Sequence, residues 1–294
     1  MGNRVIRNMN CALPESICRA RHLLHAACVA IAVGLSVPTA AAELPDLTDP
    51  RTAMETWLRL KGDIAGGVTY EWATGTAYGV PQDADGVALF AIESVTIRQF
   101  RRLSEDQYEE RTIACRLYRD AFSGAFIDEF INPLTGNRTE LRLPCGAGQP
   151  VRYSPERVAL LADVPWQSSI LDRPVTLELL RAGDEVIIRR RAFSAFTPAG
   201  GKVRRELAVD TFALPAASLA DPGITSLSPS YSWDAVRDWS GFLAMGDLPG
   251  HMYWSVVGRK FRRVQELPAE FRAALEESDP GALERTPDWE AGYD

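Results

Sequence analysis

The chain has 294 residues, of which 32 are basic and 39 acidic, so its formal net charge at pH 7 is −7. An acidic protein lacks the positive potential that nucleic acid and anionic lipid require of a binding surface. The composition therefore excludes nucleic-acid binding as the main function.

The first 42 residues are typical of a secretory signal peptide. Arginines precede an apolar stretch from Leu23 to Ala41 that carries no charged side chain, and Ala40–Ala42 supply the small residues that signal peptidase reads. We expect cleavage after Ala42 and a periplasmic or secreted mature protein with no membrane span. The alternative is a retained transmembrane anchor, because the apolar run approaches the roughly 20 residues that span a bilayer.

Cleavage would change the composition of the working protein. It removes four arginines and one glutamate, which leaves 28 basic and 38 acidic residues and a net charge near −10. Only Cys115 and Cys145 then remain to meet an oxidising compartment, and His251 is the only histidine left. We therefore expect no metal site built from thiolate or imidazole ligands, and no cofactor.

The mature chain, residues 43–294, contains no linker and no internal repeat, so we expect a single β-rich domain. Thr48-Asp49-Pro50 begins a predicted helix, which continues with apolar residues at helical spacing and stops at Gly62. The following residues are rich in aromatic and β-branched side chains. They predict strands over 67–80, 87–103, 107–118, 125–131 and 137–143. The connections between these segments are too short for parallel crossovers, so the strands form an antiparallel meander.

Ser154-Pro155-Glu156 predicts a short helix, after which a second set of strands begins. Apolar residues alternate along this set, so each strand buries one face. The residues predicted to be buried are Val175, Leu177, Leu179, Val186, Ile188, Ala192, Phe196, Val203, Leu207, Val209 and Thr211. About eight antiparallel strands with one buried face form either a sandwich or a barrel, and we favour a closed or partly closed barrel of the calycin-like kind.

Two more helix signals follow, one at Ser232 before Trp233, Val236 and Trp239, and one at Pro268. The C-terminal segment of about 268–294 is predicted to be helical and peripheral.

The predicted meander also bears on the two cysteines. It places Cys115 level with Thr139, and Cys145 lies six residues further along, about 20 Å at the rise of a strand. A disulfide requires Cα atoms within about 7 Å. We therefore predict two unpaired thiols unless residues 144–146 fold back.

The sequence contains no nucleophile elbow, P-loop, dinucleotide fingerprint or zinc-protease motif. Its densest chemical segment runs from Asp247 to Trp254 and contains a Pro-Gly turn before His251. A histidine beside a carboxylate is able to act as a general base, so His251 and Asp247 are the candidate catalytic residues. The alternative is a turn followed by an edge strand.

Several other residues are candidates for ligand binding. Asn132 lies in an Asn-Pro-Leu-Thr-Gly segment, where it would contact a ligand at a barrel mouth or simply form a turn. Arg190 lies on the same face of its predicted strand as the apolar residues. It is therefore either buried beside a carboxylate or faces a cavity that holds an anionic group. Aromatic residues such as Trp72, Tyr118 and Trp233 suit an apolar ligand cavity and suit an ordinary core equally well.

These segments together resemble one known family. The pieces of the resemblance are Trp72 with Gly75–Tyr78, Tyr118-Arg119-Asp120, Asn132–Gly136, Ser232-Trp233-Asp234, Met245-Gly246-Asp247, Pro249-Gly250 and Gly258-Arg259-Lys260. They resemble the bacterial and fungal family called domain of unknown function 1838, whose members are often exported and have no established activity. The resemblance implies a shared site that includes Asn132, Trp233, Asp247, His251 and Arg259.

Three functions are compatible with these observations. The first is an exported protein that binds a small, lipophilic ligand in a cavity near the barrel mouth. The second is a cofactor-independent hydrolase or isomerase that uses His251 and Asp247. The third is a structural or partner-binding protein of the cell envelope.

Overall fold

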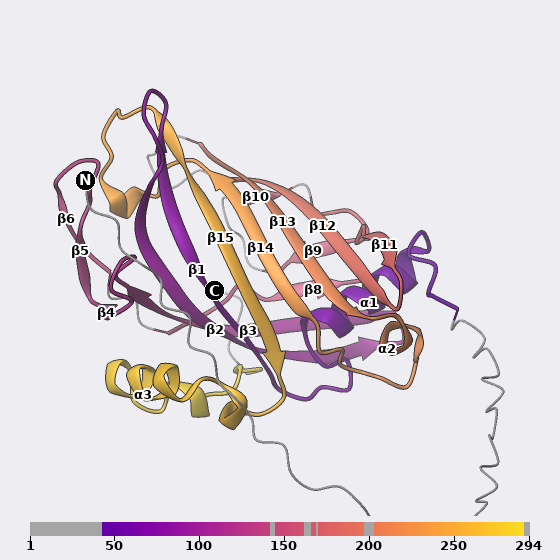
Figure 1. Ribbon diagram of the computed structural model, residues 1–294. Coiled ribbons are helices and arrows are strands. Elements are labelled where there is room, and N and C mark those ends of the chain that lie inside the picture. The colour runs from indigo at the N-terminus through magenta and orange to yellow at the C-terminus, as the bar shows by residue number, and fades with distance from the viewer. Residues whose placement is uncertain (1–42, 142–144, 162–165, 169, 197–202, 291–294) are drawn as a thin grey trace, which may run out of the picture. The chain divides into compact units, whose positions relative to one another are not determined.

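The computed structural model describes residues 43–141, 145–161, 166–168, 170–196 and 203–290 (Figure 1). The predicted signal peptide and its cleavage site lie outside these residues. No helix in the described part of the chain is long and apolar enough to cross a membrane.

Helix α1 (Pro50–Lys61) begins and ends where the sequence predicts. The Asp49 carboxylate caps it by accepting a hydrogen bond from the Thr52 amide at 2.8 Å, and the Gly62 amide donates to Leu58 O at 2.8 Å. One face of the helix is fully buried, and it packs against residues from both arms of the main sheet. The helix therefore fills one end of the curled sheet.

Strands β1 (Thr69–Pro81), β2 (Val87–Ser104) and β3 (Gln107–Arg119) are antiparallel neighbours, as predicted. They belong to a sheet of 13 strands. The other members are β4 (Phe126–Ile127), β7 (Gly146–Ala147), β8 (Val151–Tyr153), β9 (Val158–Leu160), β10 (Trp166–Ser168), β11 (Glu178–Ala182), β12 (Glu185–Phe196), β13 (Arg204–Pro215), β14 (Ser230–Arg237) and β15 (Gly250–Phe261).

The main path of this sheet runs in the order β10-β12-β13-β14-β15-β1-β2-β3-β8-β9. Figure 1 shows that the sheet curls, because β2, β3, β8 and β9 lie behind the row from β1 to β12. Among the described residues its two end strands are not paired with each other, so the fold is mainly antiparallel β and the structure shows no closed barrel.

The predicted meander ends after β3. Instead of one long strand over 125–131, the chain forms β4 and then β5 (Glu129–Ile131), which pairs with β6 (Arg138–Glu140) in a separate two-stranded sheet. The chain then returns as β7, where Gly146 lies opposite Ala114 of β3. Because of this return, Cys145 reaches Cys115.

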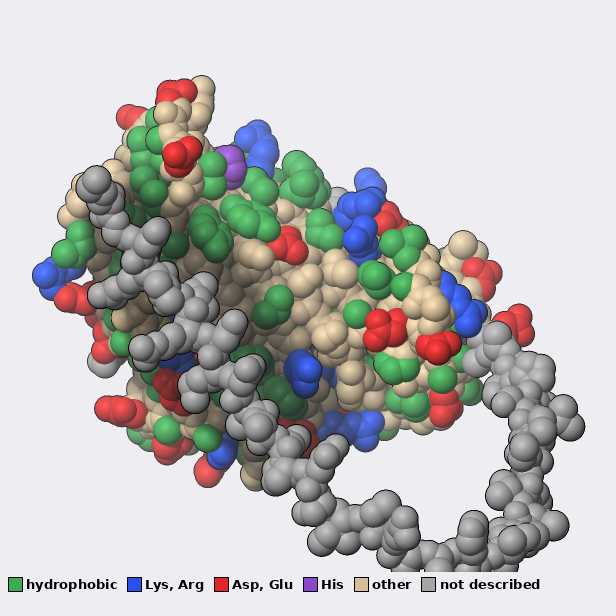
Figure 2. All heavy atoms as spheres, in the orientation of Figure 1, with side chains coloured by type: hydrophobic (Ala, Val, Ile, Leu, Met, Phe, Trp, Pro, Cys, Tyr) green, Lys and Arg blue, Asp and Glu red, His purple; other side chains and the backbone are tan. Residues whose placement is uncertain are grey.

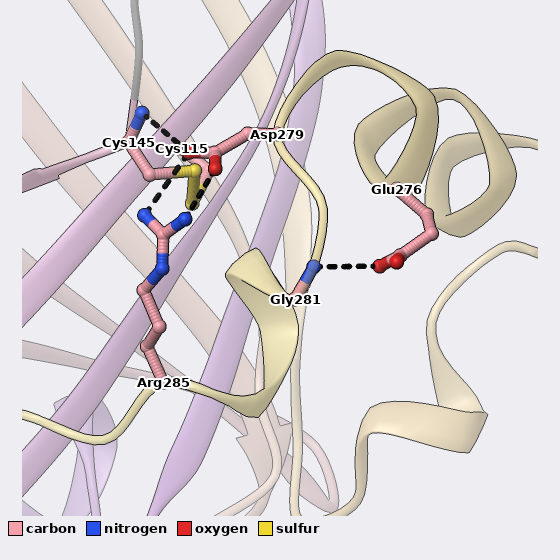
Figure 3. The surroundings of a disulfide bond; sticks show 6 residues. All are labelled: Cys115, Cys145, Glu276, Asp279, Gly281 and Arg285. Atoms are coloured by element: carbon pink, nitrogen blue, oxygen red, sulfur yellow. Dashed lines mark hydrogen bonds and ion pairs between the residues drawn. A yellow bond between two sulfur atoms is a disulfide. The ribbon is translucent and has the colours of Figure 1, made fainter.

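The prediction of two unpaired thiols is therefore wrong, since Cys115 and Cys145 form a disulfide with a Cα–Cα distance of 4.2 Å. Figure 3 shows the acid–base pair beside it: Asp279 accepts hydrogen bonds from the Cys145 amide at 3.3 Å and from Arg285 Nη1 at 3.0 Å. The pairing of Gly146 with Ala114 brings the two cysteines together.

Other predictions need correction as well. Residues 151–160 form the hairpin β8–β9 and not a helix, and the segment after Ser232 belongs to β14 and not to a helix. Strand β15 is not an edge strand, because it pairs with both β14 and β1. In β13 the buried face carries Ala208, Phe212 and Leu214, so the predicted parity was wrong and Leu207 is 44% exposed.

The helix after Pro268 is confirmed as α3 (Ala269–Ser278). It packs through Phe271 and Leu275 on the outer face of the sheet, over Val95 and the disulfide. The remaining helices are short: α2 (Ala216–Ala220), η1 (Gly241–Leu243), η2 (Val264–Glu266) and η3 (Ala282–Glu284).

Candidate functional site

A cavity of about 630 Å³ lies against the inner face of the curled sheet. Its lining comes from α1, β1, β2, β3, β13, β14, β15 and η1. Small residues at inward positions explain why the space is not filled: β1 presents Ala73 and Ala77, and β13 and β14 present Ala208 and Ala235. At Gly75 of β1, a Cβ atom would lie 2.1 Å from Ser255 O, so only glycine allows the neighbouring strand to approach this closely.

Aromatic side chains form much of the wall. Trp233 and Trp254 have ring centroids 6.3 Å apart, and Tyr118 packs edge-to-face on Phe90 at 5.2 Å. The Trp254 side chain is buried, and its indole N–H has no acceptor among the described residues. A buried donor without an acceptor is costly unless a ligand or water satisfies it.

Three arginines line the same cavity, and they differ in their partners. Arg237 is 3.5 Å from Glu206, whereas Arg116 and Arg204 have no carboxylate partner in the described part of the chain. The Arg204 guanidinium packs over Gly241, where a Cβ atom would lie 2.7 Å from Nη2. With Lys61 these arginines make four cationic side chains around the cavity, against two carboxyl groups, Glu71 and Asp210.

Lys61, the last residue of α1, faces the cavity from the filled end of the sheet. Its ammonium is 2.7 Å from the Glu71 carboxylate and lies within 5.6 to 5.8 Å of the ring centroids of Trp57, Phe212 and Tyr231. The ion pair and the three rings hold this cation in one place.

Glu71 and Lys61 belong to a larger ionic network, which also contains Arg98, Glu110 and Tyr153. Arg98 contacts Glu71 at 3.2 Å and forms an ion pair with Glu110, and the Tyr153 hydroxyl donates to Glu110 at 2.6 Å. Burial alone would raise the pKa of Glu71, but Lys61 and Arg98 outweigh it and lower the pKa to about 2. Burial, and after it Glu110, raises the pKa of Tyr153 well above the tyrosine range. Every charge in this network therefore has a protein partner.

Asp210 differs from the network in this respect. It lies on the inner face of β13, directly opposite Arg190 of β12 and Trp233 of β14. Its carboxyl group makes no hydrogen bond to any described residue and faces the cavity. Burial raises the pKa of Asp210, although Lys61 and Arg190 act against that rise.

The structure brings only two of the predicted site residues to this cavity, Trp233 and Tyr118. Arg190 lies next to it, since it is 8% exposed and its guanidinium stacks over the Trp57 ring at 3.9 Å. Asn132 is fully buried: its amide nitrogen donates to Leu243 O and to Met245 Sδ, both at 3.1 Å, and its amide oxygen accepts from the Leu134 amide. Asn132 thus joins the β5–β6 turn to the segment that follows η1.

The remaining candidates lie elsewhere. His251 is on the outer face of β15, since it alternates with the buried Met252, and Asp247 lies exposed in the preceding loop. Trp72 and Arg259 are cross-strand neighbours on the outer face, where they line a shallow groove, and Trp72 donates to Glu93 at 2.9 Å. The described residues contain no group of three or more His, Cys, Asp or Glu side chains able to hold a metal ion.

Sequence reasoning missed Lys61, Glu71, Arg116, Arg204 and Asp210. The sequence signal for these residues is a charged side chain at a position that faces inward. This signal can be recognised only when it is known which alternate residues of each strand face inward. In β13 the large apolar residues Leu207 and Val209 predict that the opposite face is buried, and Arg204 and Asp210 do not lie on that predicted face.

The fold and site define a mainly antiparallel β protein with a cavity of mixed aromatic and cationic character on the inner face of its sheet. The chain belongs to the family described as protein of unknown function (DUF1838), whose model matches residues 66–291. This confirms the resemblance found in the sequence. No curated protein and no solved structure matches the chain.

Proposed function

We propose that this protein is an exported, barrel-like binding protein for a small organic anion with an apolar body. The observation that carries the proposal is the cavity of about 630 Å³ with aromatic walls and four cationic side chains. Its volume lies within the range of about 300–1,000 Å³ that small-molecule sites occupy. The chain as a whole has a net charge of −7, so the positive character of the cavity is local. Figure 2 shows that basic and acidic side chains are interspersed on the visible face rather than gathered into a basic patch.

Two groups in the cavity lining support an anionic ligand over a neutral one. The Arg204 guanidinium has no carboxylate partner among the described residues, and the Trp254 indole N–H has no acceptor there. A carboxylate or sulfonate would supply acceptors for both kinds of donor, while Trp233 and Tyr118 would contact the apolar body.

Calorimetric titration of the protein with dodecanoate tests this function, with dodecan-1-ol as the uncharged ligand. We expect dodecanoate to bind at least about tenfold more tightly than the alcohol, because hydrogen bonds to a charged group contribute about 1.5–3 kcal/mol. Arg204→Gln should remove most of this difference.

Arg205→Gln is the matched control, because Arg205 is the neighbouring residue on the outer face of β13 and is exposed. It should bind dodecanoate as the native protein does. Equal affinity for the acid and the alcohol in the native protein would contradict an anion site, and so would an unchanged affinity in Arg204→Gln.

The hydrolase or isomerase function based on His251 and Asp247 has less support, because His251 faces away from the cavity. Partner binding has one observation in its favour. On the outer face, Leu207 and Val236 are cross-strand neighbours that are 44% and 43% exposed, and the row continues into the stacked pair Tyr253 and Tyr78. Sedimentation velocity would test whether two copies associate here, since Val236→Lys should then convert a dimer into a monomer.

A further inference from the structure

The polar groups of the cavity are divided between two ends of the cavity, one at Arg204, the first residue of β13, and one at Asp210, near the middle of that strand. Arg204 and Asp210 both lie on the inner face and are six residues apart, which is about 20 Å between Cα atoms at the rise of a strand. Arg237 of β14 lies near the Arg204 end, because it is the cross-strand neighbour of Glu206 and forms an ion pair with it. Trp233 lies at the other end, opposite Asp210.

The groups at the Asp210 end of the cavity are arranged to form hydrogen bonds with an uncharged oxygen atom of a ligand. Lys61 is fixed there by Glu71 and by surrounding rings, and it supplies a donor. Asp210 has no hydrogen-bond partner among the described residues, although it lies on the cavity wall. A second anionic group would meet Glu71 and Asp210, and a second cation would meet Lys61 and Arg190. A hydroxyl group, which both donates and accepts, satisfies the carboxyl of Asp210 and the ammonium of Lys61 together.

We propose that Asp210 and Lys61 form a second polar subsite that binds a hydroxyl group of the ligand. The ligand class is then an elongated hydroxy acid, with its anionic group at Arg204 and its hydroxyl group at the far end of the apolar body. This inference rests on the proposed function, since it names the ligand class of the same cavity. The raised pKa of Asp210 agrees with it, because a carboxyl group that keeps its proton more readily can also donate to the ligand oxygen.

The test compares the affinities of the native protein for dodecanoate and for ω-hydroxydodecanoate. One additional hydrogen-bonded contact should make the ω-hydroxy acid bind about tenfold more tightly. Moving the hydroxyl group to the α-carbon, beside the carboxylate, should remove this gain because the group then lies at the Arg204 end. Both comparisons use the native protein, so they do not depend on the folding of a variant.

Substitutions at Asp210 then assign the effect to a residue. Asp210→Leu should reduce the ratio of the two affinities to within about twofold, because leucine cannot form the hydrogen bond. Asp210→Asn should retain part of the ratio, because the amide still donates and accepts. The control is Asp234→Asn on the outer face of β14, where the carboxylate accepts from the Tyr253 hydroxyl, and it should keep the full ratio.

The possible failures are distinct. If dodecanoate binds and Arg204→Gln weakens it, but the ω-hydroxyl group adds nothing, the anion site stands and the hydroxyl subsite is wrong. A preference that survives in Asp210→Leu also overturns the subsite. If none of the acids binds, both the proposed function and this inference are contradicted.

Discussion

Two sets of charged residues lie on the inner face of the same sheet, and they differ in how their charges are satisfied. In the ionic network, Arg98 joins Glu71 to Glu110, and Lys61 and Tyr153 complete the pairs. Around the cavity, Arg116, Arg204 and Asp210 have no such partners among the described residues. A buried charge with a complete set of protein partners serves the fold, whereas one that faces a cavity without partners is available to a ligand. The comparison separates structural charge from binding charge, and Lys61 belongs to both sets, because its ammonium pairs with Glu71 and also faces the cavity.

Replacement of Arg98 should produce the largest effect. Arg98→Met leaves the buried Glu110 without its cation and Glu71 with Lys61 alone, and we expect the free energy of unfolding to fall by about 3–5 kcal/mol in urea denaturation. Arg116→Met is the paired variant from the cavity, and it should cost less than about 1 kcal/mol because no described partner is lost. Similar losses of unfolding free energy in the two variants would contradict the distinction between the ionic network and the charged residues around the cavity.

The decrease of the unfolding free energy at acidic pH should depend on Glu71. Its pKa falls from 4.5 to about 2 in the folded state, so its contribution is present above about pH 4.5 and is lost as the pH falls toward 2. Glu71→Gln should cost about 3 kcal/mol at neutral pH and flatten the dependence of unfolding free energy on pH in this window. Glu270→Gln, at an exposed carboxylate paired with Arg119, is the control and should leave the decrease at acidic pH unchanged.

Asp210 should show the smallest effect, with the opposite sign. Its pKa is raised in the folded state, so its contribution is greatest below the ordinary value of 3.8 and is lost as the pH rises through the folded pKa. Asp210→Asn cannot ionise, so the variant should be more stable than the native protein at neutral pH. The difference between the two should increase from about pH 4 upward in urea denaturation. A variant that is less stable at neutral pH would show that Asp210 has a stabilising partner.

The regular parts of the fold could be predicted from the sequence because local signals agree there. Asp49, Pro50 and Gly62 mark the ends of α1, and β1 to β3 combine strong strand propensity with short turns. These signals depend only on neighbouring residues. The antiparallel arrangement follows directly from the lengths of the connections.

The site could not be predicted in the same way, because it reverses the pattern on which the prediction depends. In β13 the inward positions include Arg204 and Asp210, while Leu207 faces solvent. A rule that places apolar residues inside therefore selects the wrong face. The strand β14 was mistaken for a helix for a related reason: Trp233 and Val236 have helical spacing, but they lie on opposite faces of a strand.

If the proposed function is correct, the disulfide should affect the rates of ligand exchange. Cys115 and Cys145 close a loop that contains the β5–β6 hairpin, and Asn132 in that hairpin is bonded to Leu243 and Met245, next to Phe242 of the cavity lining. The bridge thus restrains both ends of a segment that supports one wall of the cavity. After reduction we expect a bound ligand to dissociate faster, with less change in its association rate. Residence time would then be set in part by a covalent bond outside the cavity, on the opposite face of the sheet.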